Sequence, residues 1–178
     1  MSQEIHWYCK RQEGTEPSFR RRSRRLWRII KHPRDAWLMV RLLLWAIVLP
    51  VCKRIVPLRK LAPFMWGSPT TLRNLTQEQK ITTIVRWIYI FIFPNETSCL
   101  ERSLLLYRYL SRNNTDPRLV TGMRRTEDRN WKGHAWILVD SKPFEEALTS
   151  IQEFRPLIVF GREGIMRQAE GDPIERTE

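Results

Sequence analysis

The sequence has few cysteines, and their arrangement excludes several kinds of site. The 178 residues include three cysteines, Cys9, Cys52 and Cys99, together with three histidines. No C-x-x-C motif is present, and no cluster of cysteine and histidine has the spacing of a metal site. An odd number of widely spaced cysteines disfavours both a disulfide framework and a structural zinc site. We therefore expect no bound metal and no directly bound cofactor.

The sequence also lacks a signal peptide and a full-length membrane span. The N-terminal stretch MSQEIHWYCKRQEG has no apolar core of the kind that signal peptides need. Residues 36–51 are apolar, but this run is interrupted by Arg41 and reaches Pro50. A spanning helix needs about 20 apolar residues, so the run favours a buried or interfacial helix. We expect a cytoplasmic protein.

Charge is distributed unevenly along the chain. Residues 1–62 hold fifteen basic and four acidic side chains, whereas residues 63–178 hold sixteen and fifteen. We expect a basic, partly disordered or helical extension at 1–35 and one domain at 36–178, with a catalytic core at about 75–165. The arginine-rich segment 19–35 fits a solvated helix face, or a surface that binds anionic lipid or a partner protein. No nucleic-acid recognition motif accompanies it, so no nucleic-acid partner is expected.

The order of predicted elements indicates an α+β fold. Apolar residues recur at helical spacing in the first two thirds of the chain, whereas alternating patterns between polar turns predict strands afterwards. Helices followed by an antiparallel meander are typical of α+β proteins. The predicted helices span 34–49, a segment from 75 and 98–114, and the predicted strands span 118–123, 134–140 and 143–148.

Cys99 lies where a reactive thiol is favoured. Ser98 and Glu101 fit the S-x-x-E capping box, which would place Cys99 at the first helical position. The positive end of a helix lowers the pKa of a thiol from its usual value of about 8.5. The unpaired amides there could also bind a developing oxyanion. A buried structural cysteine is the alternative, and Cys9 and Cys52 fit only that alternative.

His134 is the predicted partner of Cys99. It opens the strand HAWILVD, in which alternation places Trp136 on the same face. A general base needs an acceptor to orient its other ring nitrogen, and the next strand offers Glu145 and Glu146. A two-residue turn between the strands would select Glu145, whereas an odd-length loop or a bulge would select Glu146. The residues themselves leave this choice open.

These segments resemble the lasso-peptide leader peptidase family, which has a transglutaminase-like, papain-related fold. The resemblance rests on SCLERSLLLYRYL, LVTGMRR and GHAWILVDSKPFEE, which cover residues 98–146, and it is weaker over 38–97. In the family a Cys-bearing helix packs on an antiparallel sheet that bears the histidine and the acid. The acid follows the histidine by a dozen residues, which implies Glu146 here, although the family more often has aspartate. The implied catalytic residues are Cys99, His134 and Glu146.

The resemblance also implies a task and partners. Such enzymes hydrolyse one peptide bond in a ribosomally made precursor, and they act with a leader-recognition protein and an ATP-dependent lasso cyclase. A fused recognition module would bring a β-rich N-terminal domain, but residues 1–62 indicate helix and arginine instead. We therefore expect a stand-alone peptidase. Its basic and apolar N-terminal part could bind the recognition protein or the surface of the inner membrane. Whether leader removal needs ATP is open.

Two other functions fit the same sequence. A transglutaminase-like acyltransferase would use the same three residues but transfer the acyl group to an amine instead of water. A non-catalytic adaptor at a membrane surface or a partner protein would instead depend on the arginine-rich segment, and its function would survive replacement of Cys99.

Overall fold

The computed structural model describes residues 6–7, 33–70, 72–93 and 99–168. Most of the predicted extension 1–35 lies outside these residues. The described chain runs from helices to strands, which confirms the α+β class. The helices are α2 (Pro33–Ile55), α3 (Leu58–Met65), α4 (Leu75–Phe91), α5 (Cys99–Arg112), the short α6 (Leu148–Ile151) and the 3-10 turn η1 (Arg162–Gly164). The strands are β1 (His6–Trp7), β2 (Pro117–Arg125), β3 (Trp131–Val139), β4 (Lys142–Phe144), β5 (Arg155–Phe160) and β6 (Met166–Gln168).

The strands form one sheet in the order β1-β3-β2-β5-β6, with β4 also paired to β3. All pairings are antiparallel except that of β1 with β3. The edge of β3 away from β2 pairs with β1 at Lys132 and Gly133 and with β4 at residues 137–139. Between these pairings, residues 134–136 have no strand partner on that edge within the described part of the chain. The chain that follows β4 can therefore approach His134 from this side.

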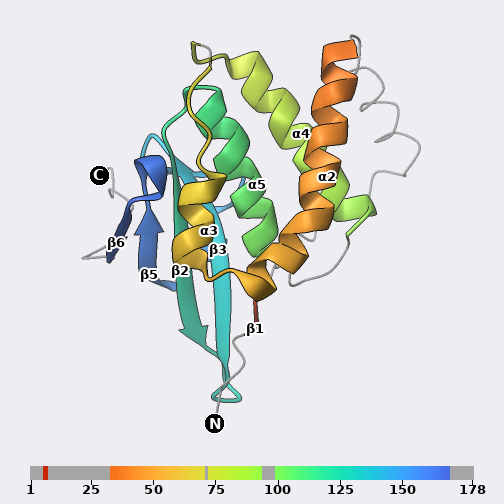
Figure 1. The fold of residues 1–178 in the computed structure, drawn as a ribbon. Helices are drawn as coiled ribbons and strands as arrows, with labels where there is room; N and C mark the ends of the chain where they lie inside the picture. Colours follow the sequence, from red (N-terminus) through yellow and green to blue (C-terminus); the bar gives the residue numbers. More distant parts are fainter. Residues whose placement is uncertain (1–5, 8–32, 71, 94–98, 169–178) are drawn as a thin grey trace.

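Helices α2 to α5 cover one face of the sheet, with α5 directly against the strands (Figure 1). Ala135, Ile137 and Val139 of β3 belong to the core that the helices share. Trp136 and Leu138 belong to a second, smaller cluster. This division confirms the alternation expected for β3, because successive side chains of a strand point to opposite faces.

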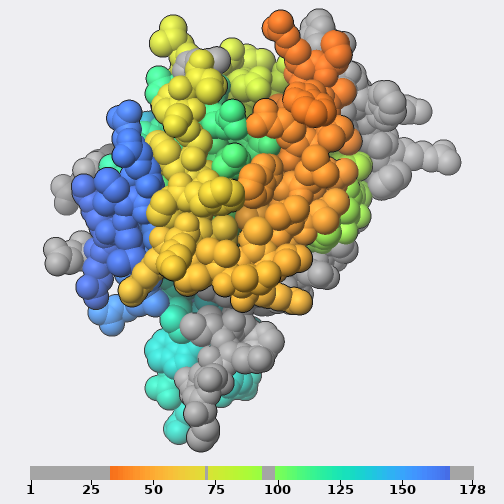
Figure 2. Space-filling model, in the orientation of Figure 1, coloured from red at the N-terminus to blue at the C-terminus, as the bar shows by residue number. Residues whose placement is uncertain are grey.

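Helix α2 is the outermost long helix, and it joins the others through two kinds of contact. Its buried apolar residues are Leu42, Ala46 and Leu49. At its start the buried carboxylate of Asp35 accepts hydrogen bonds from Lys80 of α4, at 2.9 and 3.1 Å. Figure 2 shows α2 in orange and α3 in yellow-orange on the visible surface of the molecule. Helix α2 is thus anchored on one side only.

The first long helix ends later than the sequence predicts. The helix expected at 34–49 continues through Pro50 to Ile55, although a proline removes one backbone hydrogen bond from a helix. Packing of the buried stripe on α4 and α5 outweighs this loss. The proline-containing connector that follows forms α3, with Pro63 inside it. The helix expected from residue 75 is α4, and its cap is Asn74, whose side chain accepts from the Gln77 amide at 3.1 Å.

Candidate active site

Cys99 is the first described residue of α5, directly after residues 94–98, which lie outside the described residues, and it is 1% exposed. The first amides of a helix have no partner within the helix, so they point toward groups that lie before it. Ser98, the predicted cap, lies outside the described residues. Glu101 is buried, and its Oε1 forms an ion pair with Lys53 of α2 at 2.6 Å. The first turn of α5 is therefore tied to α2.

His134 is buried in β3 and contacts a carboxylate. Its Nε2 lies 2.7 Å from Oε2 of Glu146, and the side chain of Glu146 is 10% exposed. The imidazole ring also packs beside Phe154 and Trp136, with centroids 5.0 and 5.9 Å away. These aromatic neighbours exclude water from the pair, which strengthens the interaction between imidazole and carboxylate.

Gly122 of β2 makes room for this arrangement. It is paired with His134 across the two strands. A Cβ atom at Gly122 would lie 2.8 Å from the carbonyl oxygen of Arg155 and 2.9 Å from the ring of Trp136. Any larger residue would collide with the indole of Trp136 and with the backbone of β5, so the glycine is needed for space.

The structure places Glu146, and not Glu145, against His134. The turn between β3 and β4 has two residues, Asp140 and Ser141, both with positive φ. Strict alternation after this turn would put Glu145 on the face of His134. However, Glu145 itself has a φ of 63°, which ends β4 at Phe144 and redirects the chain. The irregularity that the sequence left open therefore occurs at Glu145.

Arg102 is a member of the site that the sequence reasoning missed. Its Nη2 donates a hydrogen bond to Oε1 of Glu146 at 2.6 Å. Arg102 follows Cys99 by three residues, a spacing that places two side chains on one side of a helix. The helix that begins at Cys99 therefore also holds the carboxylate that contacts His134. The three-residue spacing from Cys99 could have indicated that Arg102 lies near the site, but it could not identify Glu146 as its partner.

A second hydrogen bond fixes the same helix to the same strand. Ser103 Oγ of α5 donates to the carbonyl oxygen of Ala135 at 2.9 Å, and both groups are buried. Ser103 lies one turn after Cys99, and Ala135 directly follows His134. Together with the contact from Arg102 through Glu146, this bond sets the first turn of α5 beside the start of β3.

Buried polar groups of α5 and α4 lie near each other at the first turn of α5. Besides the ion pair with Lys53, Glu101 has a second oxygen, Oε2, that is buried without a hydrogen-bond partner among the described residues. The hydroxyl of Tyr89 in α4 is also buried without a hydrogen-bond partner among the described residues. Burial raises the pKa of Tyr89 well above its usual value, and the nearby negative charge of Glu101 raises it further. Tyr89 is therefore neutral at physiological pH.

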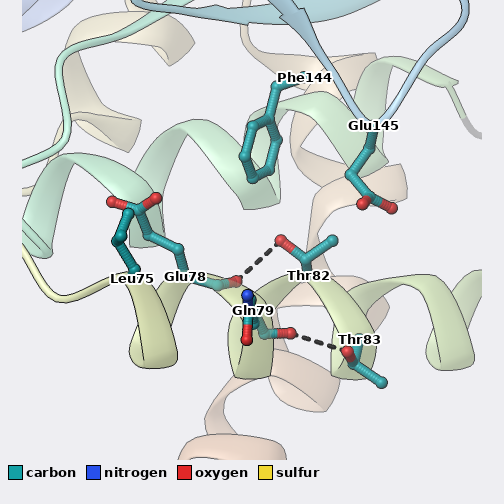
Figure 3. A pocket seen from close by; sticks show the side chains of 7 residues that line it. All are labelled: Leu75, Glu78, Gln79, Thr82, Thr83, Phe144 and Glu145. Carbon is teal, nitrogen blue, oxygen red and sulfur yellow. Dashed lines mark hydrogen bonds between the residues drawn. The ribbon is translucent and has the colours of Figure 1, made fainter.

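A pocket of about 300 Å³ lies between α4 and the chain after β4 (Figure 3). Phe144 and Glu145 point toward it from one side, and side chains of α4 form the other. Glu145 directly precedes Glu146 in the chain, whereas Cys99, His134 and Glu146 are not among the residues that line the pocket. The residues that line it are Leu75, Glu78, Gln79, Thr82, Thr83, Phe144 and Glu145.

Comparison with known protein families agrees with this architecture. The sequence pattern of the transglutaminase-like superfamily matches residues 39–159, which include most of α2 and most of β5. The chain belongs to the transglutaminase-like superfamily. This superfamily includes cysteine peptidases and acyltransferases, and its fold confirms the transglutaminase-like core predicted from the sequence. The matched segment contains Cys99, His134 and Glu146. No significant match was found among curated proteins or solved structures.

Proposed function

We propose that this protein is a cysteine peptidase of the transglutaminase-like superfamily that removes the leader from a lasso-peptide precursor. In this proposal Cys99 is the nucleophile, His134 is the general base and acid, and Glu146 orients the imidazole. The observation that carries the proposal is the chain of contacts from α5 through Arg102 and Glu146 to His134. It joins the helix that begins at Cys99 to a carboxylate–imidazole pair.

The tautomer of His134 follows from its contact with Glu146. A proton on Nε2 is favoured because the carboxylate accepts it, and the lone pair then lies on Nδ1. Nδ1 is the nitrogen that would take the proton from the Cys99 thiol. Arg102 keeps the second oxygen of Glu146 occupied, so the carboxylate is held in one orientation. Loss of Arg102 would weaken this positioning without removing a reacting group.

The proposed reaction conserves atoms and protons at each step. The Cys99 sulfur bonds to the carbonyl carbon at the junction of leader and core, while its proton passes to His134. Amides at the start of α5 stabilise the oxyanion. The C–N bond then breaks, and the imidazolium gives its proton to the leaving amine of the core. Water, deprotonated by His134, attacks the thioester carbonyl and the C–S bond breaks. The imidazolium returns its proton to the Cys99 sulfur, and the leader leaves as a carboxylic acid that ionises in water.

The lasso-peptide substrate rests on the resemblance of residues 98–146 to the leader peptidases. That resemblance implies three partners in the cytoplasm: the precursor, a leader-recognition protein and the cyclase that receives the freed amino terminus. The superfamily assignment is coarser than this, because it covers both hydrolysis and acyl transfer. The experiment that tests the substrate must therefore distinguish hydrolysis from acyl transfer.

The test is incubation of the purified protein with the precursor encoded beside its own gene and with the matching leader-recognition protein. Mass spectrometry should detect separate leader and core whose summed mass exceeds that of the precursor by one water. Cys99→Ala should abolish the reaction, whereas Cys52→Ala, at a half-buried cysteine of α2, should not. A cross-linked product without added water would instead identify an acyltransferase. Cleavage that survives Cys99→Ala would overturn the catalytic assignment.

A further inference from the structure

Helix α2 has apolar side chains on two opposite faces, and only one of them is covered. The covered face consists of Leu42, Ala46 and Leu49, which belong to the shared core. The other face is exposed, with fractions from 45% at Val40 to 76% at Ile55. We call it the outer stripe; it consists of Trp37, Val40, Leu44, Ile47, Val48, Val51 and Ile55.

The outer stripe is continuous and lies directly opposite the core. At 3.6 residues per turn its seven members fall within about 100° of the helix circumference, centred about half a turn from the covered face. Soluble helices normally have polar residues in this position. An exposed apolar patch of this kind commonly marks an interaction surface.

The charges around the outer stripe are all of one sign. Arg34 and Arg54 are exposed on α2, and Arg59 and Lys60 are exposed on α3, which follows it. The one acidic residue of α2, Asp35, is buried against Lys80. The sequence directly before α2, residues 19–32, adds seven basic residues and no acidic one. The occupant of this surface must therefore be apolar and negatively charged at its boundary.

We propose that the outer stripe binds the surface of an anionic membrane, with α2 lying in the membrane plane. Its apolar side chains would enter the boundary between headgroups and acyl chains, and the surrounding arginines would contact anionic headgroups. This inference is independent of the chemistry at Cys99. If both hold, leader removal takes place at the membrane surface.

Two other arrangements of α2 fit the structure less well. The helix is long and apolar enough to span a membrane by length and composition. Spanning would, however, strip Leu49 and its neighbours from the core and break the ion pair between Lys53 and Glu101. A second copy of the chain would bring the same basic residues together across the interface, where like charges repel.

The test is co-sedimentation of the full-length protein with vesicles. Vesicles of phosphatidylcholine with 30% phosphatidylglycerol should bind the wild-type protein at least about tenfold more tightly than pure phosphatidylcholine, because several basic side chains contribute. The stripe variant Leu44→Glu with Ile47→Glu should lose about tenfold or more of this binding. The control variant Ile165→Glu with Met166→Glu adds the same charge at exposed apolar residues near β6, and it should bind within about twofold of wild type.

Circular dichroism and thermal unfolding establish that each variant is folded, without reference to any enzymatic activity. Wild-type protein that stays in the supernatant with anionic vesicles would overturn the proposal. Equal binding by the stripe and control variants would overturn it as well. A soluble dimer that only the stripe variant dissociates would also contradict it, because the outer stripe would then belong to a second copy.

Discussion

Helices α2 and α5 contact each other, yet they distribute their side chains in opposite ways. Eleven of the fourteen residues of α5 are buried, including the polar Glu101 and Ser103. Only four of the twenty-three residues of α2 are buried, although α2 is the more apolar helix. Burial therefore follows the position of a helix in the fold and not its hydrophobicity. The buried polar residues of α5 and the exposed apolar residues of α2 are the two exceptions to ordinary packing. The first lie in the helix of the candidate active site, and the second form the proposed membrane-binding surface.

The largest expected effect concerns the candidate active site, where the two adjacent glutamates can be compared. Glu146→Gln should lower kcat/KM for precursor cleavage by about 10²- to 10⁴-fold, because a neutral amide neither fixes the imidazole tautomer nor stabilises its charged form. Glu145→Gln, at the exposed neighbour that does not contact His134, should stay within about threefold of wild type. The measurement is steady-state cleavage of the precursor. Equal losses in both variants would contradict the role of Glu146.

The two faces of α2 should differ in their effect on stability. Leu49→Ala removes a fully buried side chain and should lower the free energy of unfolding by about 2–5 kcal/mol. Leu44→Ala, on the outer stripe, should change it by no more than about 0.5 kcal/mol. Urea unfolding of the full-length protein measures both values. A large loss at Leu44 would mean that the outer stripe is covered in solution, against its proposed role.

The ion pair that joins the two helices should give a smaller effect. Lys53→Met leaves the buried carboxylate of Glu101 without its partner and should lower the free energy of unfolding by about 1–3 kcal/mol. The Lys53 side chain is 24% exposed, so water reduces the loss below that of a fully buried pair.

The double variant Lys53→Met with Glu101→Gln is the matched control for this ion pair. It removes the unpaired charge, so it should regain most of the lost stability in the same unfolding experiment. If the two substitutions simply add, the pair does not couple α2 to the first turn of α5.

Local patterns in the sequence predicted the fold class and much of the candidate site. The alternation of β3 is set by strand periodicity and was correct, and the helix expected around Cys99 is present as α5. The sequence reasoning also selected Glu146, but through family resemblance and not through strand geometry. The catalytic roles of these residues stay predictions.

The errors arose where distant contacts override local preference. The burial of Glu101 depends on its ion pair with Lys53 of another helix, which the local pattern does not reveal. The end of β4 depends on a positive φ at Glu145, which is uncommon for a residue other than glycine. The contact of Arg102 with Glu146 joins residues 44 positions apart, and no local signal identifies it.

Alkylation of the two described cysteines tests the central claim most directly. Exposure alone ranks Cys52 first, because it is half-buried whereas Cys99 is 1% exposed. The proposed thiolate at the start of α5, paired with the imidazole of His134, would reverse this order. With limiting iodoacetamide near neutral pH and peptide mapping by mass spectrometry, Cys99 should be labelled faster than Cys52, and His134→Ala should slow only Cys99. Labelling of Cys52 first, or of both cysteines equally, would contradict the account.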